Sequence, residues 1–303
     1  MILEKGPAYN SKILLFGEYS LMKGSMALSI PFDKFKGQLL FDTKSRNKKS
    51  NHYSVVYLDE YLQFLRQNNF SNEINIEEFK SDINNGLYFE CNIPISYGLG
   101  SSGAIVASIY NAYSTDEPTH DLSLLKTRFA RMESYYHGSS SGLDPLVSYI
   151  NKPILIDDYG ETRIASLSKG EQNKNAEIFL IDTKTTGETQ PLVNWFLEKN
   201  EDTEFRDKIQ NQLVPLVNNC IRNFLAGNHD SMLTEIKSLS EFTFENFKPM
   251  IPYSVVEIWK NGLATNNYQL KLCGSGGGGM MLGFAKDLEK TLNQLQDFKL
   301  HTL

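Results

Sequence analysis

The sequence is poor in cysteine, and its histidines show no clustering. It has three cysteines in 303 residues, with no Cys-x-x-Cys pair, and its five histidines have no metal-ligand spacing. An odd, scattered set of cysteines is typical of a reducing compartment. These absences argue against a disulfide framework and against a zinc site.

Long apolar runs are also missing. No stretch reaches the roughly 18 apolar residues that a membrane-spanning helix needs. Near the start of the chain, Glu4, Lys5 and Lys12 interrupt the apolar segment that a signal peptide would require. We therefore expect a soluble, cytoplasmic protein with no membrane partner.

The chain has no excess of positive charge. Its formal net charge is -6, whereas a dedicated nucleic-acid binder is usually basic. The one basic run, residues 44–49, is interpreted as a solvated loop between strands, and a patch for phosphate or an anionic surface is the less favoured alternative. Nucleic acid is therefore not expected as a partner.

The chain is long enough for one large or two medium domains with a sizeable core. A polar stretch over residues 166–175 interrupts the apolar pattern and marks either a domain boundary or a long hairpin turn. We place the boundary there, with domains 1–173 and 174–303. Apolar patterning predicts strands over residues 12–17, 27–31, 36–42 (after a turn at 31–33), 87–93, 153–157, 176–182, 268–273 and 280–284, and helices over 58–69, 101–113, 122–137, 189–199, 204–226, 230–245, 254–264 and 286–295.

The most informative segment is a glycine- and serine-rich turn, residues 94–103, between a predicted strand and a predicted helix. Glycines let a backbone approach a ligand closely, and the first turn of a helix presents unpaired N–H groups. Ser101 and Ser102 add hydroxyls for phosphate oxygens or a magnesium ion. The segment lacks the Gly-Lys-Ser/Thr of a P-loop. A phosphate site is favoured over an ordinary turn with a serine N-cap.

Two further segments carry charged groups in unusual places. Lys12 begins an apolar strand and Glu18 follows the glycine at its end, which suits either a ligand site or an exposed edge strand. Glu133 lies one helical turn before His137, and a small-residue loop leads on to Asp144. Asp144 suits a general base and Glu133 a magnesium ligand, but local chemistry alone favours helix capping for this loop and a structural role for His137.

A second glycine-rich segment, residues 274–279, lies between apolar residues rather than the polar ones that flank a flexible linker. Glycines inside an apolar hairpin indicate a backbone held tightly against something. A second phosphate-facing loop is favoured over a simple tight turn.

Together and in this order, these segments resemble the GHMP kinase superfamily of galactokinase, homoserine kinase, mevalonate kinase and phosphomevalonate kinase, and look closest to the mevalonate kinases. The resemblance runs from Lys12 to Gly279 and so covers nearly the whole chain. It implies a two-domain α+β fold, with an N-terminal domain like ribosomal protein S5 domain 2, a C-terminal ferredoxin-like domain, and the active site in the cleft.

The resemblance also implies roles for single residues. Asp144 is the base or orienting carboxylate, Lys12 stabilises the reacting oxygen, and Ser102 and Glu133 hold Mg²⁺. It implies contacts with ATP for one set of residues and contacts with the acceptor for another. The first set is Gly98, Leu99, Gly100, Ser101, Ser102, Gly274, Ser275, Gly276 and Gly277, and the second is Glu18, Tyr19, His137 and Thr189.

Four positions depart from the family pattern. Tyr19 replaces a histidine, Gly103 an alanine, Pro145 an asparagine, and Gly187 stands where mevalonate kinases tend to have a basic residue. These departures concern the acceptor more than the reaction. We expect an ATP-dependent kinase, monomeric or homodimeric, that phosphorylates a small alcohol, with mevalonate the first candidate. A sibling kinase for phosphomevalonate, homoserine or a sugar, a diphosphomevalonate decarboxylase, or a non-catalytic ligand sensor are the alternatives.

Overall fold

The computed structural model describes residues 2–42, 52–117, 119–166 and 177–303. The chain forms two compact units, each assembled from segments that are far apart in the sequence. Both the boundary expected between residues 173 and 174 and the basic run 44–49 lie outside the described residues. Unit 1 consists of Met1–Lys12, Pro31–Ile93 and Gly100–Lys152, and unit 2 of Ile13–Ile30, Pro94–Leu99 and Pro153–Leu303.

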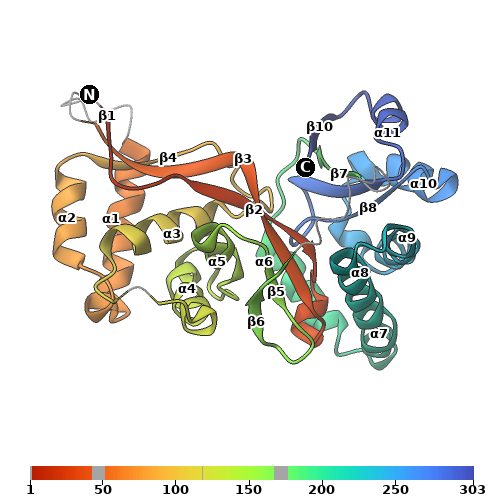
Figure 1. The fold of residues 1–303 in the computed structure, drawn as a ribbon, viewed down its shortest axis with the longest axis horizontal. Coiled ribbons are helices and arrows are strands. Elements are labelled where there is room, and N and C mark those ends of the chain that lie inside the picture. Colours follow the sequence, from red (N-terminus) through yellow and green to blue (C-terminus); the bar gives the residue numbers. More distant parts are fainter. Residues whose placement is uncertain (1, 43–51, 118, 167–176) are drawn as a thin grey trace. The chain divides into compact units, whose positions relative to one another are not determined.

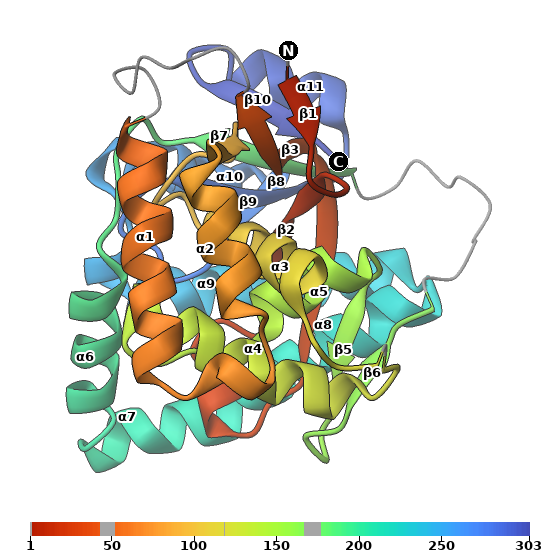
Figure 2. The same ribbon diagram turned by 90° about the vertical axis from the view of Figure 1, so that its left-hand side faces the viewer.

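Unit 1 combines antiparallel strands with helices. The long strand β3 (Ala27–Asp42) enters it at Pro31 and pairs with β1 (Ile2–Glu4) and β4 (Leu87–Cys91) (Figure 1). Strand β2 (Tyr9–Phe16) also pairs with β3. Helices α1, α2 and α3 run side by side (Figure 2). The helices are α1 (His52–Gln67), α2 (Ile76–Asn84), α3 (Ser101–Tyr113), α4 (Leu122–His137) and α5 (Leu143–Ile150).

The apolar face predicted for the first helix is the buried face of α1. Leu58, Tyr61, Leu62 and Leu65 are each at most 1% exposed. Their spacing places them on one side of the helix, which explains why this pattern forms an amphipathic helix here. Helix α3 is buried along most of its length and packs against α5 and α4. It therefore lies at the centre of unit 1.

The turn expected at residues 31–33 is wrong, because β3 continues through it as a single 16-residue strand. Residues Ala27–Ser29 pair with β5 (Ile154–Ile156), and Gly37–Phe41 pair with β4. Pro31 lies between these two ladders, so its missing N–H interrupts neither of them. The same residue is where the strand passes from unit 2 into unit 1.

Unit 2 contains a four-stranded antiparallel sheet in the order β10-β7-β9-β8. Its strands are β7 (Glu177–Asp182), β8 (Tyr268–Leu272), β9 (Met280–Ala285) and β10 (Lys299–Thr302). Strand β5 pairs with β6 (Thr162–Ile164). Its helices are α6 (Thr189–Lys199), α7 (Thr203–Lys208), α8 (Val214–Ala226), α9 (His229–Asn246), α10 (Val256–Thr265) and α11 (Leu288–Gln294). The short 3₁₀ segments of the two units are Ser20–Lys23, Phe70–Asn72, Lys248–Met250 and Tyr253–Val255.

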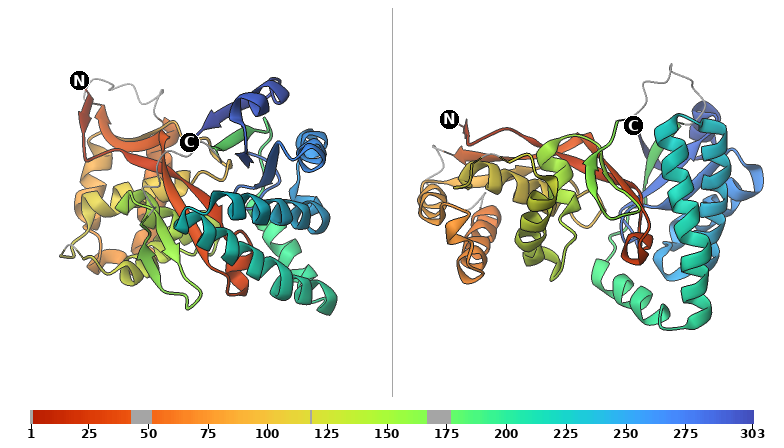
Figure 3. Two further views of the ribbon diagram at one scale, coloured as in Figure 1. Left: turned by 45° about the vertical axis from the view of Figure 1, so that its right-hand side comes forward. Right: turned by 60° about the horizontal axis from the view of Figure 1, so that its bottom comes forward.

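Helices α8 and α9 form an adjacent pair (Figure 3), and α9 also packs on β8. The single helix expected over residues 204–226 is α7 and α8 joined by a π-helical turn, Ile209–Leu213. Pro215 lies just after this turn. In a regular α-helix a proline ring clashes with the carbonyl group four residues earlier, and proline has no N–H to donate to it. The π turn thus accommodates Pro215, and apolar periodicity alone did not predict this turn.

The observed helix bounds agree best with the predicted ones where the sequence has clear signals for a helix end. α3, α4 and α6 begin and end at the predicted residues, and Asp121 caps α4 by accepting bonds from two backbone N–H groups. α2, α5, β1, β6 and β10 were not predicted, because each is short. Among the described residues, no helix is both long and apolar enough to cross a bilayer.

Candidate active site

In unit 1, Lys12 and Asp144 form an ion pair. Lys12 lies in β2 and is 4% exposed, and its Nζ is 2.9 Å from Asp144 Oδ2. Asp144 is in the first turn of α5, where the helix dipole favours a negative charge. Its side chain is 31% exposed, so one partner of the pair is buried and the other is accessible. A buried ammonium therefore has the partner that it needs.

The start of α3 lies against Lys12. A side chain at Gly100 would come within 2.8 Å of Lys12 Cγ, so glycine is required for the two to pack this closely. Gly100 and Ser101 thus begin the helix beside the lysine, and Ser102 follows in its first turn.

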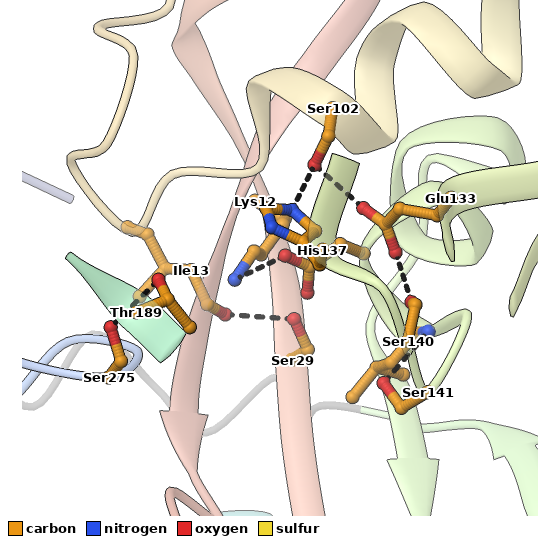
Figure 4. A network of polar contacts seen from close by, with 12 residues as sticks. Lys12, Ile13, Ser29, Ser102, Glu133, His137, Ser140, Ser141, Thr189 and Ser275 are labelled. Atoms are coloured by element: carbon orange, nitrogen blue, oxygen red, sulfur yellow. Dashed lines mark hydrogen bonds and ion pairs between the residues drawn. The ribbon is translucent and has the colours of Figure 1, made fainter. Parts of the chain in front are cut away.

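Ser102 belongs to a network with Glu133 and His137 of α4 (Figure 4). Its hydroxyl donates to Glu133 Oε1 at 2.8 Å, and His137 Nε2 lies 3.1 Å from the same Ser102 oxygen. Since Ser102 has one proton to donate, His137 is the donor of the second bond in this arrangement. Ser140 donates to the other oxygen of Glu133. Two serine hydroxyls therefore bond one buried carboxylate, and His137 contacts one of these hydroxyls.

The electrostatics of this network follow from its burial. Glu133 is 3% exposed, and burial raises the pKa of its carboxyl to about 7; the nearby charge of Asp144 acts in the same direction. The hydrogen bonds from Ser140 and Ser102 and the charge of Lys12 oppose this rise. Burial lowers the pKa of the His137 imidazole, so the histidine is a neutral donor near neutral pH. A further positive charge beside Glu133 would therefore favour the ionised form of its carboxyl group.

In unit 2, Glu18 and Lys271 form a second buried ion pair. The two side chains are 8% and 4% exposed, and their charged atoms are 2.6 Å apart. Lys271 also donates to the Leu272 carbonyl oxygen at 2.8 Å. Tyr19, the residue after Glu18, is 6% exposed, and its hydroxyl donates to the Ser275 carbonyl oxygen at 2.7 Å. This turn therefore contacts the second glycine-rich loop.

That loop packs backbone against backbone within unit 2. A side chain at Gly98 would collide with the Cys273 carbonyl oxygen, and one at Gly279 with the backbone of Tyr97. The N–H of Gly279 donates to Thr185 at 2.6 Å, and that of Gly277 to Met250 at the same distance. The expected tight packing of the glycines is therefore present, and part of their hydrogen-bonding capacity is used inside the protein.

Gly187 has a reason of its own to be glycine. A Cβ there would be 2.5 Å from the Gly276 carbonyl oxygen and 3.0 Å from Gly277 C. No basic side chain fits at this position while the loop keeps this conformation. Thr189, two residues further on, lies beside the loop, with its hydroxyl 3.1 Å from the Ser275 hydroxyl (Figure 4).

The predicted site residues thus fall into two groups. Unit 1 brings together Lys12, Gly100, Ser101, Ser102, Glu133, His137 and Asp144. Unit 2 holds Glu18, Tyr19, Gly98, Leu99, Thr189, Gly274, Ser275, Gly276 and Gly277.

Sequence reasoning missed two members of these groups. Ser140 lies in the loop for which helix capping was the alternative interpretation; its hydroxyl accepts from the Gly142 N–H at 2.9 Å just before α5 and also donates to Glu133. Lys271 stands in an apolar strand like Lys12, and the same argument about a buried ammonium could have selected it.

Residues 61–152 match the family model for the GHMP kinases N terminal domain. The resemblance inferred from the motifs is confirmed, and the chain has the two-domain α+β fold of the GHMP kinases.

The curated relatives that match are mevalonate kinases. That of Pyrococcus abyssi (strain GE5 / Orsay) is 28% identical over 171 residues, which cover 50% of this chain and 49% of that protein. The chain thus spans about half the length of this relative. That of Pyrococcus horikoshii is 23% identical over 310 residues, covering 94% of this chain and 88% of that protein.

Solved structures share the fold at low identity. The mevalonate kinase of L. major, in complex with R-mevalonate, superposes with a TM-score of 0.66 at 14% identity, over 96% of this chain and 90% of that one. The Streptococcus pneumoniae phosphomevalonate kinase gives 0.65 at 12%, over 100% and 99%. The Lactococcus lactis galactokinase complexed with galactose gives 0.65 at 14%, over 97% and 92%. Kinases for different acceptors therefore share this fold.

Proposed function

We propose that this protein is an ATP-dependent kinase that transfers a phosphoryl group to the hydroxyl of a small alcohol. The observation that carries the proposal is the Lys12–Asp144 ion pair at 2.9 Å, one member buried and the other accessible, in the same unit as the Ser102–Glu133 bond. Phosphoryl transfer needs mainly positioning and charge neutralisation, and these are the groups that supply them.

Asp144 orients the acceptor hydroxyl and takes its proton. The acceptor oxygen then forms a bond to the γ-phosphorus of ATP, the bond from that phosphorus to the β,γ-bridging oxygen breaks, and ADP leaves with the bond's electron pair. The Lys12 ammonium, fixed by Asp144, stabilises the negative charge on the reacting oxygens. A carboxylate with an accessible face is needed for this role, because the acceptor must reach it.

Ser102 and Glu133 fit a magnesium ion bound together with phosphate. In the described part of the chain, no group of three or more His, Cys, Asp or Glu side chains could hold a metal. Magnesium in kinases, however, needs only one or two protein oxygens, and the substrate phosphates and water supply the rest. Glu133 is a buried carboxylate whose pKa is raised to about 7, so a cation beside it would stabilise its charged form. A bound Mg²⁺ would neutralise phosphate charge during transfer.

We assign ATP phosphate binding to two places. The start of α3, Gly100 to Ser102, offers N–H groups of a helix first turn together with two hydroxyls. Gly98 and Leu99, and the loop Gly274 to Gly277, supply backbone in unit 2. Of the loop amides, that of Gly277 donates to Met250, so we expect the earlier ones to carry the contact.

Mevalonate is the acceptor we propose first, and with it a role in isoprenoid synthesis. The curated relatives named mevalonate kinase support this choice. The shared fold of phosphomevalonate kinase and galactokinase keeps those acceptors open. Because Gly187 has no room for a basic side chain, the charge that a carboxylate-bearing acceptor requires must come from another residue.

The decisive experiment is magnesium-dependent ADP release from ATP with mevalonate, phosphomevalonate, galactose and homoserine as separate acceptors. We expect turnover with mevalonate and less than about one tenth of it with the others, since a site that pairs buried polar groups rejects a mismatched acceptor strongly. Turnover with another alcohol alone would keep the chemistry and change the acceptor. Binding of ATP without turnover of any acceptor would contradict the kinase proposal and favour a ligand sensor.

A further inference from the structure

The ring of Tyr19 lies inside unit 2. It packs on Phe196, with ring centroids 4.9 Å apart, and on Phe247 at 5.6 Å. Burial raises the pKa of its phenol, so the hydroxyl keeps its proton at physiological pH. That proton is donated to the Ser275 carbonyl oxygen at 2.7 Å. The apolar body of the side chain is therefore seated in the unit's core, and its one polar atom holds the glycine-rich loop.

The backbone at Tyr19 is held in an unusual conformation. Its φ of 61° and ψ of -41° are uncommon for a residue with a side chain. Such a conformation persists only where the surroundings over-determine it, and here Glu18 provides part of the reason. Glu18 is fixed by its buried ion pair with Lys271, which lies four residues before Ser275. Two consecutive side chains thus hold the loop, one at the strand that leads into it and one within it.

The two halves of the loop have different hydrogen-bond partners. In the second half, the N–H groups of Gly277 and Gly279 donate to Met250 and Thr185, and Thr183 donates from its N–H and its hydroxyl to the Gly279 carbonyl oxygen. At Ser275 the bonds come from side chains: Tyr19 binds the carbonyl oxygen, and Thr189 lies beside the hydroxyl. The conformation at Ser275 therefore depends on the tyrosine hydroxyl more than the conformation at Gly279 does.

The space around Tyr19 does not suit an alcohol substrate. A cavity of about 20 Å³ adjoins it, lined by Glu18, Lys271, Thr243 and apolar side chains. This volume holds about one water molecule. A molecule of the size of mevalonate or a sugar cannot enter it, so the buried side of Tyr19 offers no acceptor site.

We propose that Tyr19 is a positioning residue that holds the glycine-rich loop through Ser275, and that it does not bind the acceptor. This inference rests on the proposed kinase function for its catalytic consequence, because the loop is there assigned to ATP. Its structural content, a hydroxyl that keeps the loop ordered, is independent of any activity. The role of Tyr19 is thus to keep Ser275 and its neighbouring amides in one arrangement.

The test compares Tyr19→Phe with Tyr268→Phe in the whole chain. The Tyr268 hydroxyl also donates to a backbone carbonyl, that of Ile258, at 2.7 Å, and it is likewise in unit 2. We measure amide hydrogen exchange of the ligand-free proteins. Loss of a hydrogen bond is worth about a factor of ten in a local opening equilibrium. We expect exchange about tenfold faster at Gly277, whose N–H is bonded to Met250 two residues after Ser275, in Tyr19→Phe, and unchanged exchange there in Tyr268→Phe.

Two exchange results would overturn the inference. One is wild-type exchange at Gly277 in Tyr19→Phe. The other is equally faster exchange there in both variants, which would mean that loss of any buried hydroxyl loosens the unit. Neither result depends on whether the protein is a kinase.

Kinetics then test the catalytic consequence. We expect Tyr19→Phe to raise the KM for ATP about tenfold and to leave the KM for the acceptor within twofold of wild type, as loss of one hydrogen bond on the donor side predicts. The opposite pattern, a raised acceptor KM with an unchanged ATP KM, would overturn the positioning role. If the wild-type protein turns over no alcohol, the proposed function fails, and the exchange result still decides what Tyr19 does.

Discussion

Asp144 and Lys12 form an ion pair, but their side chains differ in how far they are buried. Lys12 is almost fully enclosed, whereas the Asp144 side chain is 31% exposed. If Lys12 is removed, Asp144 can still be hydrated, so the fold should tolerate the change. If Asp144 is made neutral, the lysine keeps an oxygen acceptor but loses its counter-charge. Removing Lys12 and neutralising Asp144 therefore test the charge of the pair while the fold is kept.

We predict that Asp144→Asn lowers kcat by about 10²- to 10⁴-fold, the usual contribution of a positioned proton acceptor. The protein should stay folded but melt at a lower Tm, because the buried Lys12 ammonium loses its counter-charge. Lys12→Ala should also abolish most turnover while the protein stays folded. Steady-state kinetics and thermal melts measure both effects. Asp158→Asn, which breaks an ion pair with Arg222 between two exposed side chains, is the matched control and should leave kcat unchanged. Full activity of both Asp144→Asn and Lys12→Ala would show that the catalytic site lies elsewhere.

Helices α3 and α5 meet at Gly103. A Cβ there would be 2.7 Å from Asp144 C and 2.8 Å from Pro145 N, so the two backbones approach more closely than any side chain allows. Glycine inside a helix costs about 1 kcal/mol relative to alanine, and this approach explains why it is present. Two departures from the family pattern, Gly103 and Pro145, are thus in contact. Their contact sets where Asp144 lies relative to Ser102.

We predict that Gly103→Ala lowers kcat by at least about tenfold and destabilises the protein by about 1–3 kcal/mol, because the added methyl group displaces the start of α5. Gly262→Ala is the control, since its Cβ would also lie 2.7 Å from a neighbour, Tyr268, within unit 2. It should lose similar stability in chemical denaturation and keep its kcat. Equal kcat in the two variants would mean that this helix contact does not position Asp144.

The chain passes repeatedly between its two units. Ile13–Ile30 belongs to unit 2, although the rest of that unit comes mostly after residue 153. Phe16 stacks on Phe284 at 5.7 Å, and Glu18 is paired with Lys271. A piece of the N-terminal sequence is therefore part of the core of unit 2. The oligomeric state, monomer or homodimer, and the cytoplasmic location remain predictions.

We predict that residues 174–303, expressed alone, do not form a stable unit 2. Without residues 13–30 the fragment exposes the surface that Phe16 covers and leaves the buried Lys271 without its partner, a loss of about 3–5 kcal/mol for the ion pair alone. Circular dichroism melts and dye binding to exposed apolar surface measure this. Cooperative melting of the fragment at the Tm of the whole chain would contradict the prediction and support an independent C-terminal domain.

Local signals predicted much of the secondary structure. Apolar periodicity and helix-end signals predicted the first and last residues of α3, α4 and α6 correctly. The signal failed where tertiary pairing overrode it, as at Pro31, where β3 continues because the proline lies between two ladders. It also failed to reveal the role of Ser140, whose hydroxyl accepts a backbone N–H before α5 and also donates to Glu133. A side chain's partner far away in the sequence decides between these interpretations.

The order and composition of the motifs determined the resemblance to the GHMP kinases, because glycines, serines, a lysine and two carboxylates stand at the spacings of that family's motifs. Only the tertiary structure decided what each residue contacts. It paired Lys12 with Asp144, put Ser102 between Glu133 and His137, and directed the Tyr19 hydroxyl to Ser275. The physical reason is that charge and backbone conformation are local properties of a sequence, whereas burial and hydrogen-bond partners arise only when distant segments pack together.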